Sequence, residues 1–161
     1  LTLALLGPGD AFGEIALLDG LMRSANAFAE SNIECLVLPA KAVERCLGKD
    51  PALARDLIYS LCELSRRNLE TISSFAFSDL DARLSKLLCD LAVDHASIDG
   101  QQAVFLRKFS QTDLALLLGV TREAINKRFK RLEQDGLVKV EKSRLVLPNL
   151  PELSSRAVSD A

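Results

Sequence analysis

Residues 110–135 constrain the fold more than any other part of the chain, because their pattern predicts two short helices joined by a tight turn. Ser110 can cap the first helix, and Asp113 completes a capping box with it. Gly119 stands where the turn needs a residue that tolerates positive φ, and Thr121 can cap the second helix. The expected inner faces consist of apolar residues at helical spacing, namely Leu114, Leu117, Leu118, Ile125, Phe129 and Leu132.

The outer side of the second helix is mostly basic and polar. It carries Arg122, Glu123, Asn126, Lys127 and Lys130. An ordinary helical hairpin with a solvated basic face is the alternative interpretation. Small, glycine and branched residues at Ala115, Gly119 and Ile125 favour a helix-turn-helix motif instead, and the exposed residues are of types that read base edges. The second helix of such a motif lies in the DNA major groove.

The residues after this helix pair fit a wing. Gly136 is suited to end the second helix. Residues 137–141 and 144–147 then predict a two-stranded hairpin that turns at Lys142 and Ser143. We therefore expect a winged helix-turn-helix whose partner is double-stranded DNA.

The distribution of charge supports this expectation. Residues 100–147 contain ten lysine and arginine residues against five acidic ones, whereas the rest of the chain has ten against seventeen. A basic block confined to one compact unit is typical of nucleic-acid binding.

Composition excludes several other classes of protein. At 161 residues and 48% hydrophobic content, the chain can form one large domain or two small ones with an ample core. No apolar run reaches membrane-spanning length and no signal peptide is present, so we expect a cytoplasmic protein without a membrane partner. The four cysteines form no CxxC pair and histidine occurs once, so we expect no metal site and no enzyme. Because the chain begins at Leu1 without Met, we expect it to be a piece of a longer protein.

The first part of the chain contains three segments with strand character. They are residues 1–6, 23–30 and 33–38, the second of which alternates polar and apolar residues. Residues 13–18 leave room for one helical turn at most. Short strands separated by Gly-rich turns predict an all-β roll.

Gly13, Glu14 and Arg23 are the chemically distinctive residues of this part. A turn with free backbone N–H groups beside an arginine makes a phosphate cradle. Glu14 can accept hydrogen bonds from ribose hydroxyls, and Arg23 can pair bidentately with a phosphate. The alternative is a surface Glu–Arg pair across a turn, which contributes little.

A long helix should connect the two parts. Asp50 and Pro51 form a helix start, and no Gly or Pro follows until about Phe77. A helix of this size spans about 39 Å, which is long for a small domain unless a second chain covers its apolar stripe. We expect a homodimer whose heptad seam consists of Ile58, Leu61, Ser65, Asn68, Ile72 and Phe75. Asn68 near the middle of the seam either contacts a ligand or fixes the register of the two helices.

A further helix should run from Asp79 to about Ala96, started by Ser78 with Asp81. We expect a hinge at the break between the two long helices. No clear pattern follows Pro148, so we expect no regular structure in the tail.

The segment FGEIALLDGLMRSANAFA, residues 12–29, resembles the phosphate-binding cassette of cyclic-nucleotide-binding domains. With the helix-turn-helix behind it, residues 1–147 resemble the Crp/Fnr family of bacterial transcription regulators. The resemblance implies an α+β fold: the C-terminal part of a jelly-roll-like β-roll sensor at 1–49, a dimerisation helix at 50–77, a winged helix-turn-helix at 78–147 and a tail at 148–161. The first half of the β-roll does not lie within this chain.

The resemblance also implies roles for individual residues. Glu14 matches the position that holds the ribose 2′-hydroxyl, and Arg23 the position that neutralises the cyclic phosphate. The implied ligand-binding set is Gly13, Glu14, Ile15, Ala16, Arg23, Ser24, Ala25 and Asn68. The implied DNA-binding set is Ser110, Gln111, Thr112, Thr121, Arg122, Glu123, Asn126, Lys127 and Lys142.

Two functional hypotheses stay open. In the first, a cyclic nucleotide such as cyclic AMP controls a homodimer that binds an operator and acts with RNA polymerase. Nucleotide-responsive members of the family carry adjacent hydroxyl residues on the dimer helix, whereas this chain has Asn68 and Leu69 there. In the second hypothesis, the dimer therefore binds DNA without a small-molecule ligand, and the β-roll is an interaction module. Neither hypothesis requires another cofactor.

Overall fold

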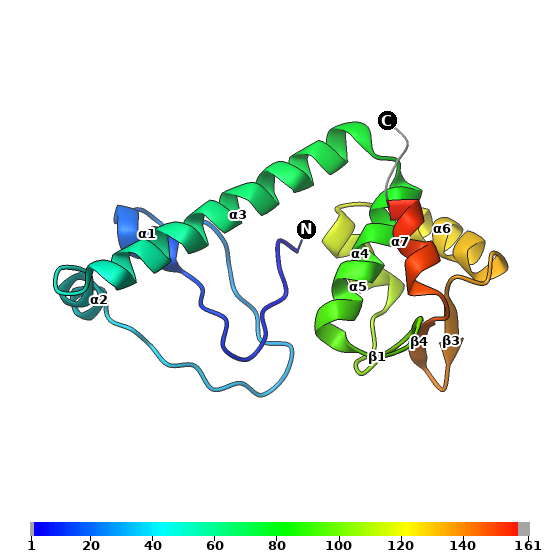
Figure 1. Ribbon diagram of the computed structural model, residues 1–161, viewed down its shortest axis with the longest axis horizontal. Coiled ribbons are helices and arrows are strands. Elements are labelled where there is room, and N and C mark those ends of the chain that lie inside the picture. The colour runs from blue at the N-terminus through cyan, green and yellow to red at the C-terminus, as the bar shows by residue number, and fades with distance from the viewer. Residues whose placement is uncertain (1, 158–161) are drawn as a thin grey trace. The chain divides into compact units, whose positions relative to one another are not determined.

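The computed structural model describes residues 2–157, except for the side chains of Phe75 and Phe77. The chain divides into two compact units. The first, here called the N-terminal unit, is Leu6–Asn68; the second, here called the C-terminal unit, comprises Leu69 onward together with the segment up to Leu5. Figure 1 shows the order of the elements along the chain.

The N-terminal unit consists of helices and long connecting loops (Figure 1). Its elements are α1 (Glu14–Asp19), α2 (Ala40–Leu47) and the first part of α3 (Pro51–Phe77). Glycines in the left-handed region flank α1, with φ 86° at Gly13 and 68° at Gly20. Helix α1 has six residues, more than the single turn expected, and α2 was not expected.

The strands expected in the first part of the chain are not formed. Residues 2–6, 23–30 and 33–38 are outside any strand, and Leu1 lies outside the described residues. A strand exists only where its N–H and C=O groups pair with a neighbouring strand, and these segments do not pair with one another. Their apolar side chains accordingly stay exposed, as at Phe28 and Leu36. The strands expected for the partial β-roll are therefore not formed within this chain, whereas the expected α+β class is confirmed for the chain as a whole.

Helix α3 confirms the predicted long helix, with 27 residues. The Asp50 carboxylate accepts a hydrogen bond from the Ala52 N–H at 2.9 Å, and Pro51 occupies the first helical position, where its missing N–H costs nothing.

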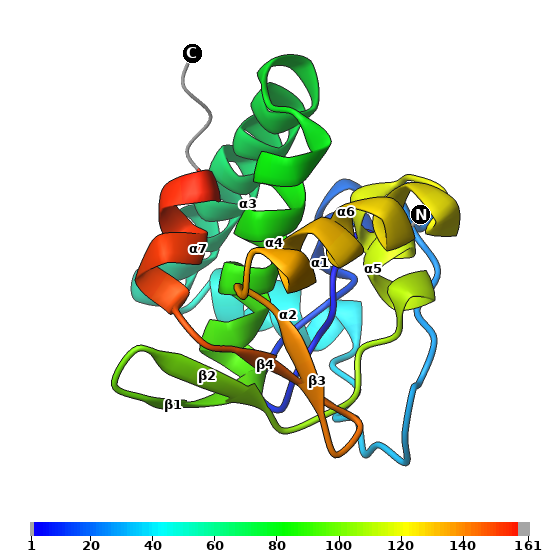
Figure 2. The ribbon, with the colours of Figure 1, turned by 90° about the vertical axis from the view of Figure 1, so that its right-hand side faces the viewer.

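The C-terminal unit combines helices with a small sheet. Its elements after α3 are α4 (Leu80–His95), β1 (Ala96–Asp99), β2 (Gln102–Phe105), α5 (Gln111–Leu118), α6 (Arg122–Gln134), β3 (Lys139–Glu141), β4 (Arg144–Leu147) and α7 (Leu150–Ala157). The four strands are antiparallel in the order β1-β2-β4-β3. Figure 2 shows this sheet along one side of the unit, with the helices above it.

The core of the C-terminal unit draws on every one of these helices. Leu84 and Leu88 of α4, Leu114 of α5, Ile125 of α6 and Leu153 of α7 are almost entirely buried. Burial of a large aliphatic side chain contributes about 1.5–3 kcal/mol relative to leaving it exposed, so these residues are a main source of the unit's hydrophobic stabilisation.

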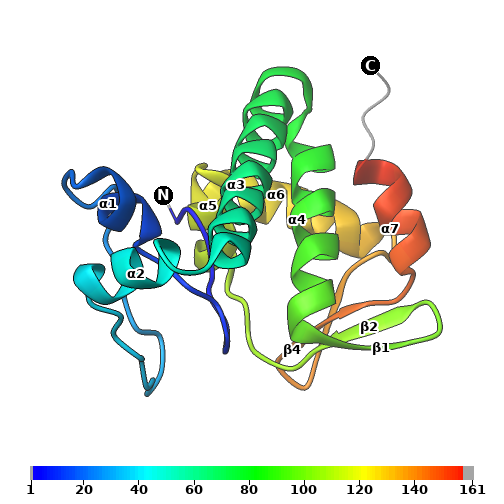
Figure 3. The same cartoon turned by 60° about the vertical axis from the view of Figure 1, so that its left-hand side comes forward.

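Three details of this unit differ from expectation. Asp79 rather than Ser78 caps α4, because its carboxylate accepts the Ala82 N–H at 2.8 Å. The β1–β2 hairpin was not expected. The prediction of an unstructured tail was wrong for residues 150–157, since α7 lies against α4 (Figure 3) and buries Leu153.

Candidate functional sites

The helix-turn-helix forms as its sequence predicts. Ser110 and Asp113 make a reciprocal capping box, with the Asp113 N–H donating to Ser110 Oγ at 3.2 Å and the Ser110 N–H donating to Asp113 Oδ2 at 2.7 Å. Gly119 ends α5 with φ 65°, and Thr121 Oγ1 accepts the Ala124 N–H at the start of α6. Each end of the turn is therefore fixed by a local interaction, which sets the direction in which α6 leaves α5.

A contact from α4 strengthens this turn. The guanidinium of Arg83 donates through Nη2 to the carbonyl of Leu118 at 2.7 Å. Leu118 is the last residue of α5, where carbonyl groups lack helical partners and a cation is favoured. Arg83 therefore ties the turn of the motif to α4. Sequence reasoning missed this role, because the two residues are 35 positions apart.

Helix α6 presents the expected polar face. Ile125, Phe129 and Leu132 are buried, as predicted from their spacing. On the other side Arg122, Glu123 and Lys127 are exposed and Asn126 is half-buried. The exposed side of α6 therefore offers side chains with hydrogen-bonding heads that can reach base edges.

The predicted wing also forms, although its first strand begins at Lys139 rather than at Leu137. Strands β3 and β4 pair with Glu141 opposite Arg144, and the turn residues Lys142 and Ser143 have φ 48° and 63°. Two successive left-handed residues are the geometry of a type I′ hairpin turn, which matches the twist of the two strands. Lys142 is exposed at the tip of this hairpin.

All nine residues predicted to bind DNA lie in the C-terminal unit. The first helix of the motif supplies the exposed Ser110 and Thr112 and the half-buried Gln111, and Thr121 is exposed before α6. The unit therefore brings together the start of α5, the outer face of α6 and the wing.

The cassette residues lie in the N-terminal unit. Arg23 folds back on the start of α1, where its Nη1 donates to the carbonyl of Gly13 at 2.8 Å. A Cβ at Gly13 would collide with that guanidinium, and φ of 86° also favours glycine there. Glu14, the first residue of α1, is half-buried beside them. Arginine has five N–H donors, so the contact with Gly13 leaves others for a phosphate.

The remaining cassette residues follow the same loop and helix. Ala16 is half-buried, whereas Ile15, Ser24, Ala25 and Asn68 are exposed.

The predicted seam on α3 is uncovered within this chain. Ile58 and Ile72 are 58% and 63% exposed, Leu61 is half-buried, and Ser65 and Asn68 are exposed. The side chain of Phe75 lies outside the described residues.

The described residues show neither a metal centre nor a membrane span. No group of three or more His, Cys, Asp or Glu side chains among them could hold a metal ion. No helix among them is long and apolar enough to cross a bilayer.

Comparisons with known proteins match both parts of the chain. Residues 82–156 match the model of the Crp-like helix-turn-helix domain, and residues 1–50 match that of the cyclic nucleotide-binding domain. The first match ends inside α7, so this helix belongs to the matched domain.

Several regulators resemble the chain over most of its length. It is 24% identical over 155 residues to a CRP-like cAMP-activated global transcriptional regulator of Mycobacterium tuberculosis, covering 96% of this chain and 69% of that protein. It is 30% identical to the cyclic AMP receptor protein of Thermus thermophilus over 86% of this chain and 61% of that protein. A solved CRP/FNR-family transcriptional regulator, also from Thermus thermophilus, superposes with a TM-score of 0.62 at 25% identity, over 70% of this chain and 57% of that one. The chain thus spans about three fifths to two thirds of the length of these relatives.

The matches at the two ends of the chain point to the same family. The helix-turn-helix and its wing provide the match at the C-terminal end, and the cassette provides the match at the N-terminal end. The chain belongs to the Crp/Fnr family of transcription regulators.

Proposed function

We propose that this chain works as a homodimer that binds a double-stranded DNA operator and regulates transcription in the cytoplasm. The observation that supports it best is the capped helix-turn-helix whose second helix, α6, buries its apolar side and exposes Arg122, Glu123 and Lys127. In this motif the N-terminal residues of the second helix contact base edges in the major groove.

The positions of the side chains divide the contacts into two kinds. Arg122, Glu123, Asn126 and Lys127 project from the first turns of α6 and read bases. A second group of residues contacts the DNA backbone. These residues lie at the start of α5, at the cap of α6 and at the tip of the wing: Ser110, Gln111, Thr112, Thr121 and Lys142. Contacts of the first kind give sequence preference, whereas contacts of the second kind give affinity for every sequence.

The exposed stripe on α3 supports the homodimer. Large apolar side chains such as Ile58 and Ile72 recur along a long helix and stay uncovered by their own chain. A second copy of α3 would bury them. Two-fold docking of such a dimer on DNA requires the two α6 helices to lie about 34 Å apart, which is one turn of DNA. RNA polymerase is the further partner we expect for such a dimer.

The cassette supports control by an anionic ligand. Arg23 and the Gly13 turn provide cation and backbone donors for a phosphate, and Glu14 can accept from ribose hydroxyls. Since several relatives are named as cAMP-activated, cyclic AMP is the first nucleotide to test. The competing proposal, a ligand-independent dimer, is supported by the departure at Asn68 and Leu69, which carry no hydroxyl pair.

Measurement of DNA binding tests the regulator itself. The full chain is used to enrich duplexes from a random pool, and its affinity for the enriched duplex and for a scrambled duplex is measured by fluorescence anisotropy. Arg122→Ala should lose about 1–3 kcal/mol of discrimination at one base position. Lys142→Ala should weaken binding to both duplexes equally. It should also reduce the slope of log affinity against log salt concentration by about one unit. The proposal is refuted if wild type enriches no sequence.

A calorimetric titration with cyclic AMP and with cyclic GMP tests the ligand. Binding that Arg23→Ala abolishes would support the nucleotide-controlled regulator. An absence of heat in both proteins would support the ligand-independent dimer.

A further inference from the structure

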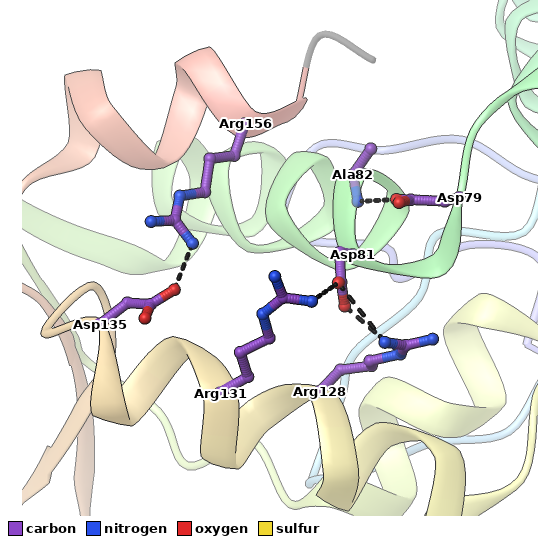
Figure 4. Close-up of polar contacts among 7 residues, drawn as sticks. All are labelled: Asp79, Asp81, Ala82, Arg128, Arg131, Asp135 and Arg156. Atoms are coloured by element: carbon purple, nitrogen blue, oxygen red, sulfur yellow. Dashed lines mark hydrogen bonds and ion pairs between the residues drawn. The ribbon is translucent and has the colours of Figure 1, made fainter. Parts of the chain in front are cut away.

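Asp81 holds two arginines of α6 against the start of α4. Its Oδ1 lies 3.3 Å from Arg128 Nε, and its Oδ2 lies 3.1 Å from Arg131 Nη1. Arg128 Nη1 also donates to Oδ2 at 3.5 Å. Figure 4 shows both guanidinium groups directed toward this one carboxylate. Both carboxylate oxygens are therefore engaged by α6.

The cap of α4 leaves the Asp81 carboxylate available for this role. The neighbouring Asp79 accepts the Ala82 N–H, so Asp81 is not needed to cap the helix. Asp81 instead lies in the first turn of α4, where the positive end of the helix dipole favours a negative charge.

The two arginines lie on the flank of α6 between its buried side and its DNA side. Arg128 and Arg131 are three residues apart and so share one side of the helix. The residues directly before them, Lys127 and Lys130, lie toward the exposed face. A rotation of α6 about its axis would therefore bring the arginines toward DNA and turn the base-reading residues away.

Burial distinguishes the two ion pairs. The side chains of Asp81 and Arg128 are 29% and 35% exposed, whereas that of Arg131 is 63% exposed. Water screens the Arg131 contact more strongly, so the Arg128 contact, which uses both carboxylate oxygens, is the stronger constraint. A separate ion pair between Arg156 of α7 and Asp135 holds the C-terminal end of α6 (Figure 4).

We propose that Asp81 is a positioning residue for base recognition. By engaging Arg128 and Arg131 it fixes the rotation of α6 on α4 and withholds both guanidinium groups from DNA phosphates. This inference rests on the DNA-binding function proposed above and adds a residue that touches no base. Loss of Asp81 frees two cations beside the DNA, which raises affinity for any sequence while base reading becomes less exact.

The test compares charge-matched variants of the full chain on the enriched and scrambled duplexes described above, at one fixed salt concentration. Asp81→Asn should lower the ratio of the two affinities about tenfold, as expected when a contact network is broken. In a companion salt series it should also steepen the salt dependence by about 0.9 unit of slope for each arginine that reaches a phosphate. Glu133→Gln removes the same charge from an exposed position on α6, and it should leave both the ratio and the slope near those of wild type.

Further variants separate positioning from a general loss of structure. Asp81→Glu keeps the carboxylate and should restore most of the ratio. Arg128→Gln should also lower the affinity ratio. The double variant with Asp81→Asn should lower this ratio by less than the product of the two single fold-changes. If Asp81→Asn does not fold, as judged by circular dichroism, Arg128→Gln decides the question alone.

The outcomes distinguish this inference from the proposed function. If wild type prefers its enriched duplex and Asp81→Asn keeps that preference within twofold, the inference is overturned and the DNA-binding function stands. A loss of the ratio in Glu133→Gln equal to that in Asp81→Asn also overturns it. If wild type enriches no sequence, the proposed function fails first.

Discussion

Replacing Leu153 by alanine tests whether α7 is an integral part of the DNA-binding unit. Leu153 is fully buried between α7 and the rest of the unit, at 0% exposure. The substitution removes three carbon atoms, which costs about 2.4 kcal/mol at about 0.8 kcal/mol for each buried methylene. The cavity left behind brings the expected loss in unfolding free energy to about 3 kcal/mol. For a unit of this size, such a loss lowers the midpoint of thermal unfolding by roughly 12–24 °C.

The assay is thermal unfolding of the full chain by circular dichroism, with anisotropy of a bound duplex as a second report on the C-terminal unit. Leu106→Ala is the matched control, because it makes the same chemical change at a side chain that is 65% exposed. We expect the control to shift the midpoint little. If Leu153→Ala shifts the midpoint no more than Leu106→Ala does, α7 does not stabilise the unit and the reasoning from burial is refuted.

Two further predictions follow from exposure and from pKa. Ile72→Asp should shift the chain from dimer to monomer in sedimentation, because it places a charge in the predicted dimer seam of α3. Val93→Asp, at another exposed apolar position, should leave the dimer intact. If both variants sediment alike, Ile72 does not lie in a dimer interface. Burial, with a smaller contribution from Asp90, raises the pKa of Cys89 to about 11, so at pH 8 it is almost entirely a thiol. Alkylation followed by mass spectrometry should show Cys89 reacting more slowly than the exposed Cys35, Cys46 and Cys62, with the difference narrowing as the pH approaches 11. Equal rates at pH 8 would contradict the burial of Cys89.

The elements that the sequence predicted well are those set by local signals. The capping box at Ser110 and the glycine at 119 act within one or two helical turns, so their pattern is complete in a short stretch of sequence. The wing is similar, because its two strands are neighbours in the chain and pair with each other.

The β1–β2 hairpin, helix α7 and the role of Asp81 were not predicted from the sequence. The last two depend on partners far along the chain, whereas the hairpin has a local signal. Strands β1 and β2 flank the two-residue turn Gly100-Gln101, and a glycine at the first position of such a turn is a recognised hairpin signal that could have revealed them. Helix α7 has few apolar residues, and only its packing against α4 shows why Leu153 matters. Asp81 matched a capping pattern in the sequence, but its partners on α6 lie 47 and 50 residues away.

The two units differ in the source of their stability, and this difference bears on how regulation can work. The described residues of the N-terminal unit include no buried side chain, whereas the C-terminal unit has a continuous core from α4 to α7. A segment that exposes Phe28, Leu36 and Val37 is stabilised when other surfaces cover these side chains. Under the function proposed above, DNA binding would therefore rest on a unit that is stable through its own contacts, whereas the cassette lies in a unit whose described side chains are not buried. A ligand at the cassette would shift the conformational equilibrium of the N-terminal unit only by its differential affinity for the two states of that unit.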